Sequence, residues 1–86
     1  MTHADAVALR AEWYSLPPDA MTDRATVAAA LYLAPQSMET MAIKGGGPRY
    51  TRIGRRALYR KADVLQWMET KGRTVENTAQ LSEAAR

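Results

Sequence analysis

The sequence predicts a mainly α-helical domain that carries one small β-hairpin, an α+β fold. Apolar residues recur at helical spacing in four stretches, and prolines or glycines separate these stretches from one another. Between the third and fourth stretches, a segment with a glycine at its centre alternates its side chains with a period of two, as strands do. At 86 residues, the chain is long enough for one small domain with tails and too short for two cores.

A first helix is expected over residues 3–16. Its apolar stripe has spacings of three and four residues and consists of Ala6, Leu9, Trp13 and Leu16. Pro17 and Pro18 end the helix, because proline lacks a backbone donor and restricts the residue before it. Trp13 and Tyr14 either complete the core through this helix or face a partner, and the sequence leaves both open.

The second and third helices are expected from about Arg24 to Leu33 and from Gln36 to about Lys44, after a short connection over residues 19–23. Candidate caps for the second helix are Thr22 and Asp23. The predicted buried faces comprise Val27, Ala30, Leu31, Met38, Met41 and Ile43. Two helices with a short break between them predict a helix-turn-helix, although a plain αα-hairpin without a ligand fits these two segments equally well.

The hairpin is expected over residues 49–60 and the fourth helix over residues 61–71. Gly54 suits a tight turn because it tolerates positive φ, and Arg55 and Arg56 are placed at the tip. Hairpin side chains predicted to alternate between the two faces are Tyr50, Arg52 and Tyr59 with Thr51, Ile53 and Leu58. The apolar face of the fourth helix comprises Val64, Leu65, Trp67 and Met68.

The chain divides into three parts on this interpretation. Residues 1–18 form an N-terminal helix or arm, residues 19–71 the folded domain, and residues 72–86 a polar tail that is disordered or helical only when bound. A helix-turn-helix followed by an arginine-edged hairpin is typical of a winged helix-turn-helix, in which the hairpin is the wing.

The basic residues are strongly segregated. Seven of the twelve Lys and Arg lie between Lys44 and Lys61, where there is no acidic residue, so the remainder has five basic residues against nine acidic ones. The segment is therefore +7 and the rest −4, within a net charge of +3. Such clustering favours a polyanionic partner over a merely solvated surface.

From about Thr22 to Thr70 the chain resembles a known family. The residues that carry the resemblance are Thr26–Leu31, Ser37–Met41, Lys44–Tyr50, Ile53–Arg56, Leu58–Arg60 and Asp63–Trp67. Their order is similar to that in the small winged helix-turn-helix domain of phage and integrative-element excisionases, or recombination directionality factors, a group related to MerR-type domains. There are two departures from the family: Tyr32 stands where a turn glycine is common, and Glu39 and Ala42 stand where basic residues are common.

The resemblance implies that residues 36–44 enter the major groove of double-stranded DNA and that the wing lies along an adjacent minor groove. The candidate recognition-helix residues are Gln36, Ser37, Glu39, Thr40 and Lys44. The candidate wing residues are Arg49, Thr51, Arg52, Arg55, Arg56, Arg60 and Lys61. Arginine suits phosphate because it binds two oxygens at once, Gln36 can pair with adenine, and Glu39 either accepts from cytosine or repels phosphate.

Several function classes are disfavoured. The chain has no Cys, and its single His has no companion ligand, so neither a disulfide, a metal site nor a cofactor is expected. No catalytic constellation is visible, and Gly45–Gly47 lacks the Lys-Ser/Thr ending of a phosphate loop. Without a long apolar stretch or a signal-like N-terminus, we expect no membrane partner and a cytoplasmic, nucleoid-associated protein.

Three functions therefore remain. The first is an excisionase that has no chemistry of its own, binds beside a recombination site, self-associates along the DNA, bends it and directs a site-specific integrase towards excision. The second is a local transcriptional regulator on the same fold. The third is a protein-interaction adaptor that uses the fold without DNA. Stacking of Tyr50, Tyr59 or Trp67 on single-stranded bases is the less favoured role for these aromatic residues, compared with a place in the core.

Overall fold

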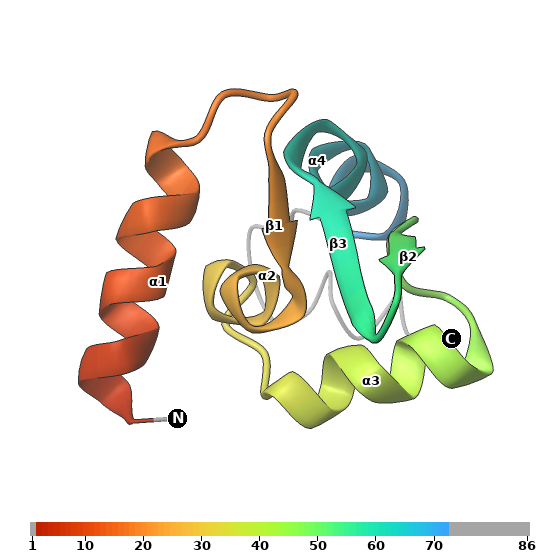
Figure 1. The fold of residues 1–86 in the computed structure, drawn as a ribbon, viewed down its shortest axis with the longest axis horizontal. Coiled ribbons are helices and arrows are strands. Elements are labelled where there is room, and N and C mark those ends of the chain that lie inside the picture. Colours follow the sequence, from red (N-terminus) through yellow and green to blue (C-terminus); the bar gives the residue numbers. More distant parts are fainter. Residues whose placement is uncertain (1, 73–86) are drawn as a thin grey trace, which may run out of the picture.

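The computed structural model describes residues 2–72, and in them the predicted α+β fold is confirmed. Four helices surround a small three-stranded antiparallel sheet in this part of the chain (Figure 1). In chain order the elements are α1 (His3–Ser15), β1 (Met21–Asp23), α2 (Arg24–Ala30), α3 (Pro35–Lys44), β2 (Thr51–Ile53), β3 (Arg56–Arg60) and α4 (Lys61–Lys71). The polar tail predicted for residues 72–86 lies, from residue 73 on, outside the described residues.

The sheet has the order β1-β3-β2, so β3 is its central strand. The predicted connection over residues 19–23 is wrong in its last part, because Met21–Asp23 pairs with β3 and places Thr22 opposite Tyr59. A three-residue strand is too short to show a period of two, and it becomes a strand only through its partner. Lys61 and Ala62 at the start of α4 donate their backbone N–H groups to Ala20 and Pro18.

The hairpin turn is one residue shorter than predicted at its tip. Ile53 pairs with Arg56, so Gly54 and Arg55 alone form the loop and Arg56 is the first residue of β3. Gly54 has a φ of 61°, which a two-residue hairpin loop requires at its first position.

Helix α2 ends at Ala30, three residues before the predicted end. Tyr32 adopts a left-handed φ of 58°, the conformation that glycine usually supplies at this point of a helix end. The N–H of Leu33 donates to Ala28 O at 2.8 Å and that of Tyr32 to Ala29 O at 3.2 Å, which is the hydrogen-bond pattern of a Schellman motif. The motif turns the chain sharply from α2 into α3.

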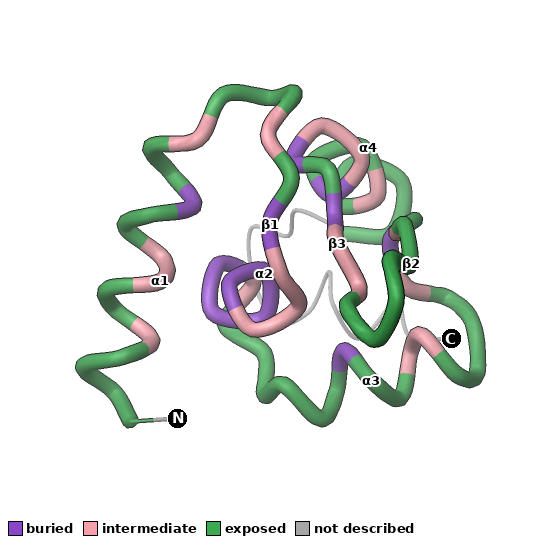
Figure 2. The backbone as a smooth tube through the Cα atoms, viewed as in Figure 1, coloured by how far each residue is buried: buried purple, intermediate pink, exposed green. Residues whose placement is uncertain are grey.

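The core lies where α1, α2, α3, β3 and α4 meet. Its buried side chains include Trp13, Val27, Met38, Tyr59 and Val64, one from each of these elements, and Figure 2 shows α2 buried along most of its length. Trp13 therefore completes the core, whereas its neighbour Tyr14 is 64% exposed. Alanines at positions 28–30 allow α1 to pack closely against α2.

Three predicted core positions are wrong. Ile43 is 85% exposed, Met68 40% and Leu65 37%, because α3 and α4 each contact the core along a narrower stripe than their apolar residues span. Trp67 is half-buried, and its indole N–H donates to Gly46 O at 2.8 Å. This bond ties α4 to the glycine loop that leads from α3 to the hairpin. No described helix is long and apolar enough to span a membrane.

Candidate nucleic-acid interface

The turn of the hairpin lies beside α3 (Figure 1), and the two elements enclose an open groove of about 340 Å³. We call it the arginine groove. Its lining residues are Asp23, Arg24, Ala25, Glu39, Arg52, Arg55, Arg56 and Ala57. Four arginines and two carboxylates thus come together from the start of α2, from α3 and from the hairpin.

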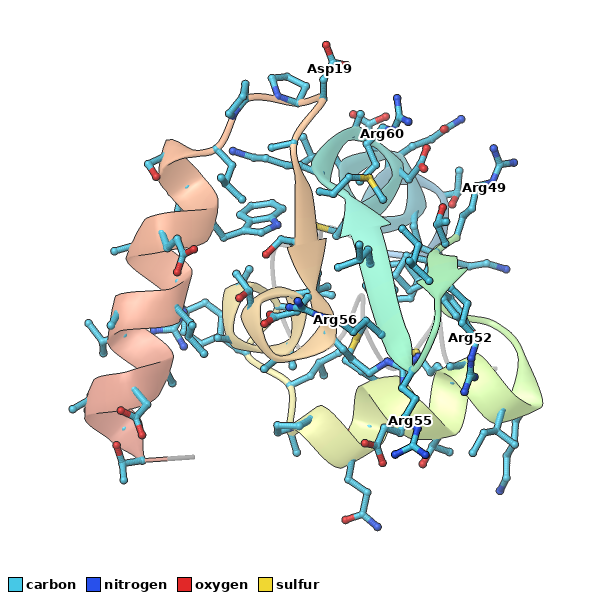
Figure 3. The ribbon with its side chains drawn as sticks, viewed as in Figure 1. Asp19, Arg49, Arg52, Arg55, Arg56 and Arg60 are labelled. Atoms are coloured by element: carbon cyan, nitrogen blue, oxygen red, sulfur yellow. The ribbon has the colours of Figure 1, made fainter. Side chains whose placement is uncertain are left out.

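The hairpin arginines of the groove are exposed. Arg52 and Arg55 lie over α3, whereas Arg56 lies beside α2 (Figure 3). Within residues 2–72 none of these guanidinium groups forms an ion pair with a carboxylate at 4.0 Å or less. Arg52 makes one long contact, from Nε to Gly54 O at 3.4 Å. Their cationic ends are therefore free to bind an anion.

Arg24 belongs to the groove although the sequence did not single it out. Its Nε donates to the Tyr59 hydroxyl at 3.0 Å, and its guanidinium lies 5.3 Å from the centre of the Tyr50 ring. This hydrogen bond is the main reason that the pKa of Arg24 is raised above its usual value. Nearby Glu39 raises that pKa further. No sequence signal separates Arg24 from an ordinary surface arginine, because Tyr59 is 35 residues away.

The other predicted wing residues lie elsewhere on the hairpin. Arg49 and Arg60 lie away from the tip, towards α4 (Figure 3). Arg49 lines a second, smaller groove of about 190 Å³ with Asp63, Gln66, Trp67 and Thr70. Thr51 is exposed at the start of β2. The predicted basic rim is therefore divided between two ends of the hairpin, and only one end carries the arginine groove.

The assignment of Lys61 to the wing is wrong. Its side chain is only 9% exposed and points into the fold, where Nζ donates to Leu16 O at 2.7 Å and lies 4.7 Å from the Trp13 ring centre. The last turn of α1 contains no basic residue, so Lys61 supplies the positive charge that stabilises this helix end. Its ammonium group therefore binds the end of α1 inside the protein and does not add to the positive charge of the surface.

The exposed face of α3 carries the predicted polar residues Gln36, Ser37, Thr40 and Lys44. Pro35 opens the helix, as its fixed φ allows. The Thr40 hydroxyl donates to Gln36 O at 3.0 Å, so its proton is already engaged and the hydroxyl oxygen acts chiefly as an acceptor. Glu39 faces the arginine groove instead of the open face. Gln36, Ser37 and Lys44 therefore remain as the side-chain donors that reach outward from α3.

No protein-family model matches the sequence, and no curated protein matches it. Among residues 2–72, no group of three or more His, Asp or Glu side chains is gathered as metal ligands would be. What the described surface does offer is a concentration of guanidinium groups next to a polar helix face. Guanidinium forks match the oxygens of phosphate and carboxylate.

Proposed function

We propose that this protein binds double-stranded DNA through α3 and the hairpin. The observation that carries the proposal is the arginine groove next to α3, where Arg52, Arg55 and Arg56 form no ion pair with any carboxylate of residues 2–72. Positive charge gathered along one edge is the electrostatic footprint of a nucleic-acid site, because each cation that meets a phosphate releases condensed counterions.

The hairpin and α3 have different roles in this proposal. The hairpin arginines hold backbone phosphates and fix the position of the protein on the duplex, which carries no sequence information directly. Helix α3 lies in the major groove, where Gln36 can pair with adenine and Lys44 with guanine or phosphate. With so few outward donors on α3, backbone contact supplies most of the affinity.

Within DNA binding, we favour an architectural role of the excisionase type, which rests on the family resemblance of residues 22–70. A single module of this size buries little DNA surface, so specific binding needs neighbouring copies on the same duplex. Val7 and Tyr14 are exposed on α1, 46% and 64% respectively, and offer an apolar surface for such contacts. A site-specific integrase is the partner that this role requires.

A local transcriptional regulator is the alternative within the same binding mode. Footprinting on a long fragment separates the two roles: extended, phased protection is expected of an architectural protein, and one discrete operator of a regulator. Protection of a single short site at saturating protein would count against the excisionase role.

The binding proposal is tested by a salt series. Replacing Arg52, Arg55 and Arg56 with Gln should weaken binding to every duplex and lower the slope of log K against log salt concentration by about 0.9 for each phosphate that the variant no longer neutralises. Lys71→Gln is the matched control, an exposed basic residue at the end of α4 whose replacement should leave the slope unchanged. An equal slope for the triple variant and the wild type would refute the role of the hairpin. Retained partner binding with no shift of DNA at moderate salt would favour the adaptor.

A further inference from the structure

Arg24 differs from the other cations of the arginine groove in how firmly it is held. The hairpin arginines are exposed, whereas Arg24 is half-buried at the first position of α2. Its Nε is bonded to Tyr59 at 3.0 Å, and both the Tyr50 and Tyr59 rings lie within 5.8 Å of its guanidinium carbon. Tyr59 is itself only 1% exposed, so its hydroxyl is a fixed anchor.

This arrangement leaves one side of the guanidinium available. An arginine has five N–H donors, and the Tyr59 bond uses the one on Nε. Within residues 2–72 the two terminal nitrogens have no hydrogen-bond partner, and the side chain lines the groove. The donors that remain are those that bind a phosphate in the two-pronged manner. A side chain already held in one orientation loses little conformational entropy when it binds.

We propose that Arg24 is a pre-oriented phosphate-binding residue and that Tyr59 is its positioning residue. One phosphate of the duplex backbone enters the arginine groove, bound by the terminal nitrogens of Arg24 together with the hairpin arginines. The inference rests on the proposed DNA binding and adds α2 as a third element of the interface. The sequence pattern alone predicts only a structural role for α2.

The composition of the groove favours phosphate of a polyanion over an isolated carboxylate. Glu39 and Asp23 also line the groove and repel any anion that enters. Asp23 accepts from Thr26 N at 2.8 Å as the N-cap of α2, so it cannot turn away without uncapping the helix. A ligand must therefore bring enough negative charge to overcome the repulsion of Glu39 and Asp23, which neighbouring phosphates along a duplex do.

The decisive experiment compares Arg24→Gln, Tyr59→Phe and the control Lys71→Gln on one duplex across a salt series. Arg24→Gln should lower the salt slope by about 0.9. Tyr59→Phe keeps the buried ring and the Arg24 charge but frees the guanidinium, so affinity should fall by about fivefold with the slope unchanged. Lys71 is exposed on the last turn of α4 and does not line the groove, so its replacement should produce neither result.

A merely structural Arg24 would behave differently. In that case Arg24→Gln lowers the melting temperature, leaves the salt slope as in the wild type, and overturns the proposal. If Arg24→Gln does not fold, Tyr59→Phe decides: an unchanged affinity overturns the proposal as well.

A second measurement separates this inference from the DNA proposal. In nitrogen-15 spectra of the full chain, the Nε–Hε signal of Arg24 should move on titration with inorganic phosphate, and by more than that of Arg60. Equal movement would overturn the site. A wild-type protein that binds no duplex but shows the Arg24 response would refute the proposed function and leave the anion site standing.

Discussion

The basic side chains that pack around α1 and those at the hairpin turn have the same formal charge, but the first bind groups of the protein itself and the second face the solvent. Arg10 donates to Ala29 O at 2.9 Å and stacks at 3.7 Å on the Tyr32 ring, and Lys61 donates to Leu16 O. Arg55 and Arg56, by contrast, are exposed and free of internal ion pairs within the described residues. The first pair satisfies helix-end carbonyls, and the second pair remains available to a ligand. Charge counted along a sequence therefore overestimates the charge that a partner meets.

Lys61→Met gives the largest expected decrease in stability. It removes the buried donor of Leu16 O and the positive charge at the end of α1, which should lower the free energy of unfolding by about 2 kcal/mol. Thermal unfolding measures this as a fall in melting temperature of roughly 10 °C. Lys71→Met on the exposed last turn of α4 is the control and should change the free energy by less than about 0.5 kcal/mol.

The same variant also checks that Lys61 does not contact DNA. Below its melting temperature, Lys61→Met should bind DNA with the wild-type salt slope, because the Lys61 charge does not face the solvent. A lower slope would show that Lys61 contacts DNA. It would then no longer differ from the arginines of the hairpin turn.

Tyr32→Val should cost less, about 1 kcal/mol. A β-branched residue is poorly tolerated at a φ of 58°, and the variant also removes the ring on which Arg10 stacks. Tyr32→Gly is the matched variant: it relieves the left-handed strain but loosens the unfolded chain and removes the same ring. These effects oppose one another, so the free energy of unfolding should stay within about 0.5 kcal/mol of the wild type. Denaturant unfolding of both variants measures the difference in the free energy of unfolding. Equal decreases in stability would show that the positive φ at position 32 does not strain a β-branched residue.

The elements that the sequence predicted well are those that depend on local signals. Helix α4 has the predicted bounds, Lys61–Lys71, since its apolar spacing and Gly72 are local in the chain. Gly54 placed the hairpin turn for the same reason. The arginines of the turn were predicted as a group because they are adjacent in sequence.

The features that were missed depend on distant partners. Strand β1 forms only by pairing with β3. The role of Lys61 depends on Leu16, 45 residues away in the sequence, and the role of Arg24 depends on Tyr59, 35 residues away. Nothing within a few residues of Arg24 distinguishes it from Arg10, although one lines a groove and the other lies between two helices. Which basic side chains bind groups inside the protein is therefore known only once the fold is known.

Glu39→Gln gives the smallest expected effect. It tests whether the arginines of the groove are available to phosphate by removing a carboxylate that lies beside them. Glu39 is the carboxylate of α3 among the four groove arginines, and it opposes any phosphate that enters. Removing its charge at an exposed site should raise affinity by about threefold on every duplex. Glu69→Gln, an exposed carboxylate on α4, is the control and should leave affinity unchanged. Competitive binding to a randomised duplex pool measures both. If Glu39→Gln instead weakens binding only at sites with cytosine, Glu39 reads a base and the groove is not purely a phosphate site.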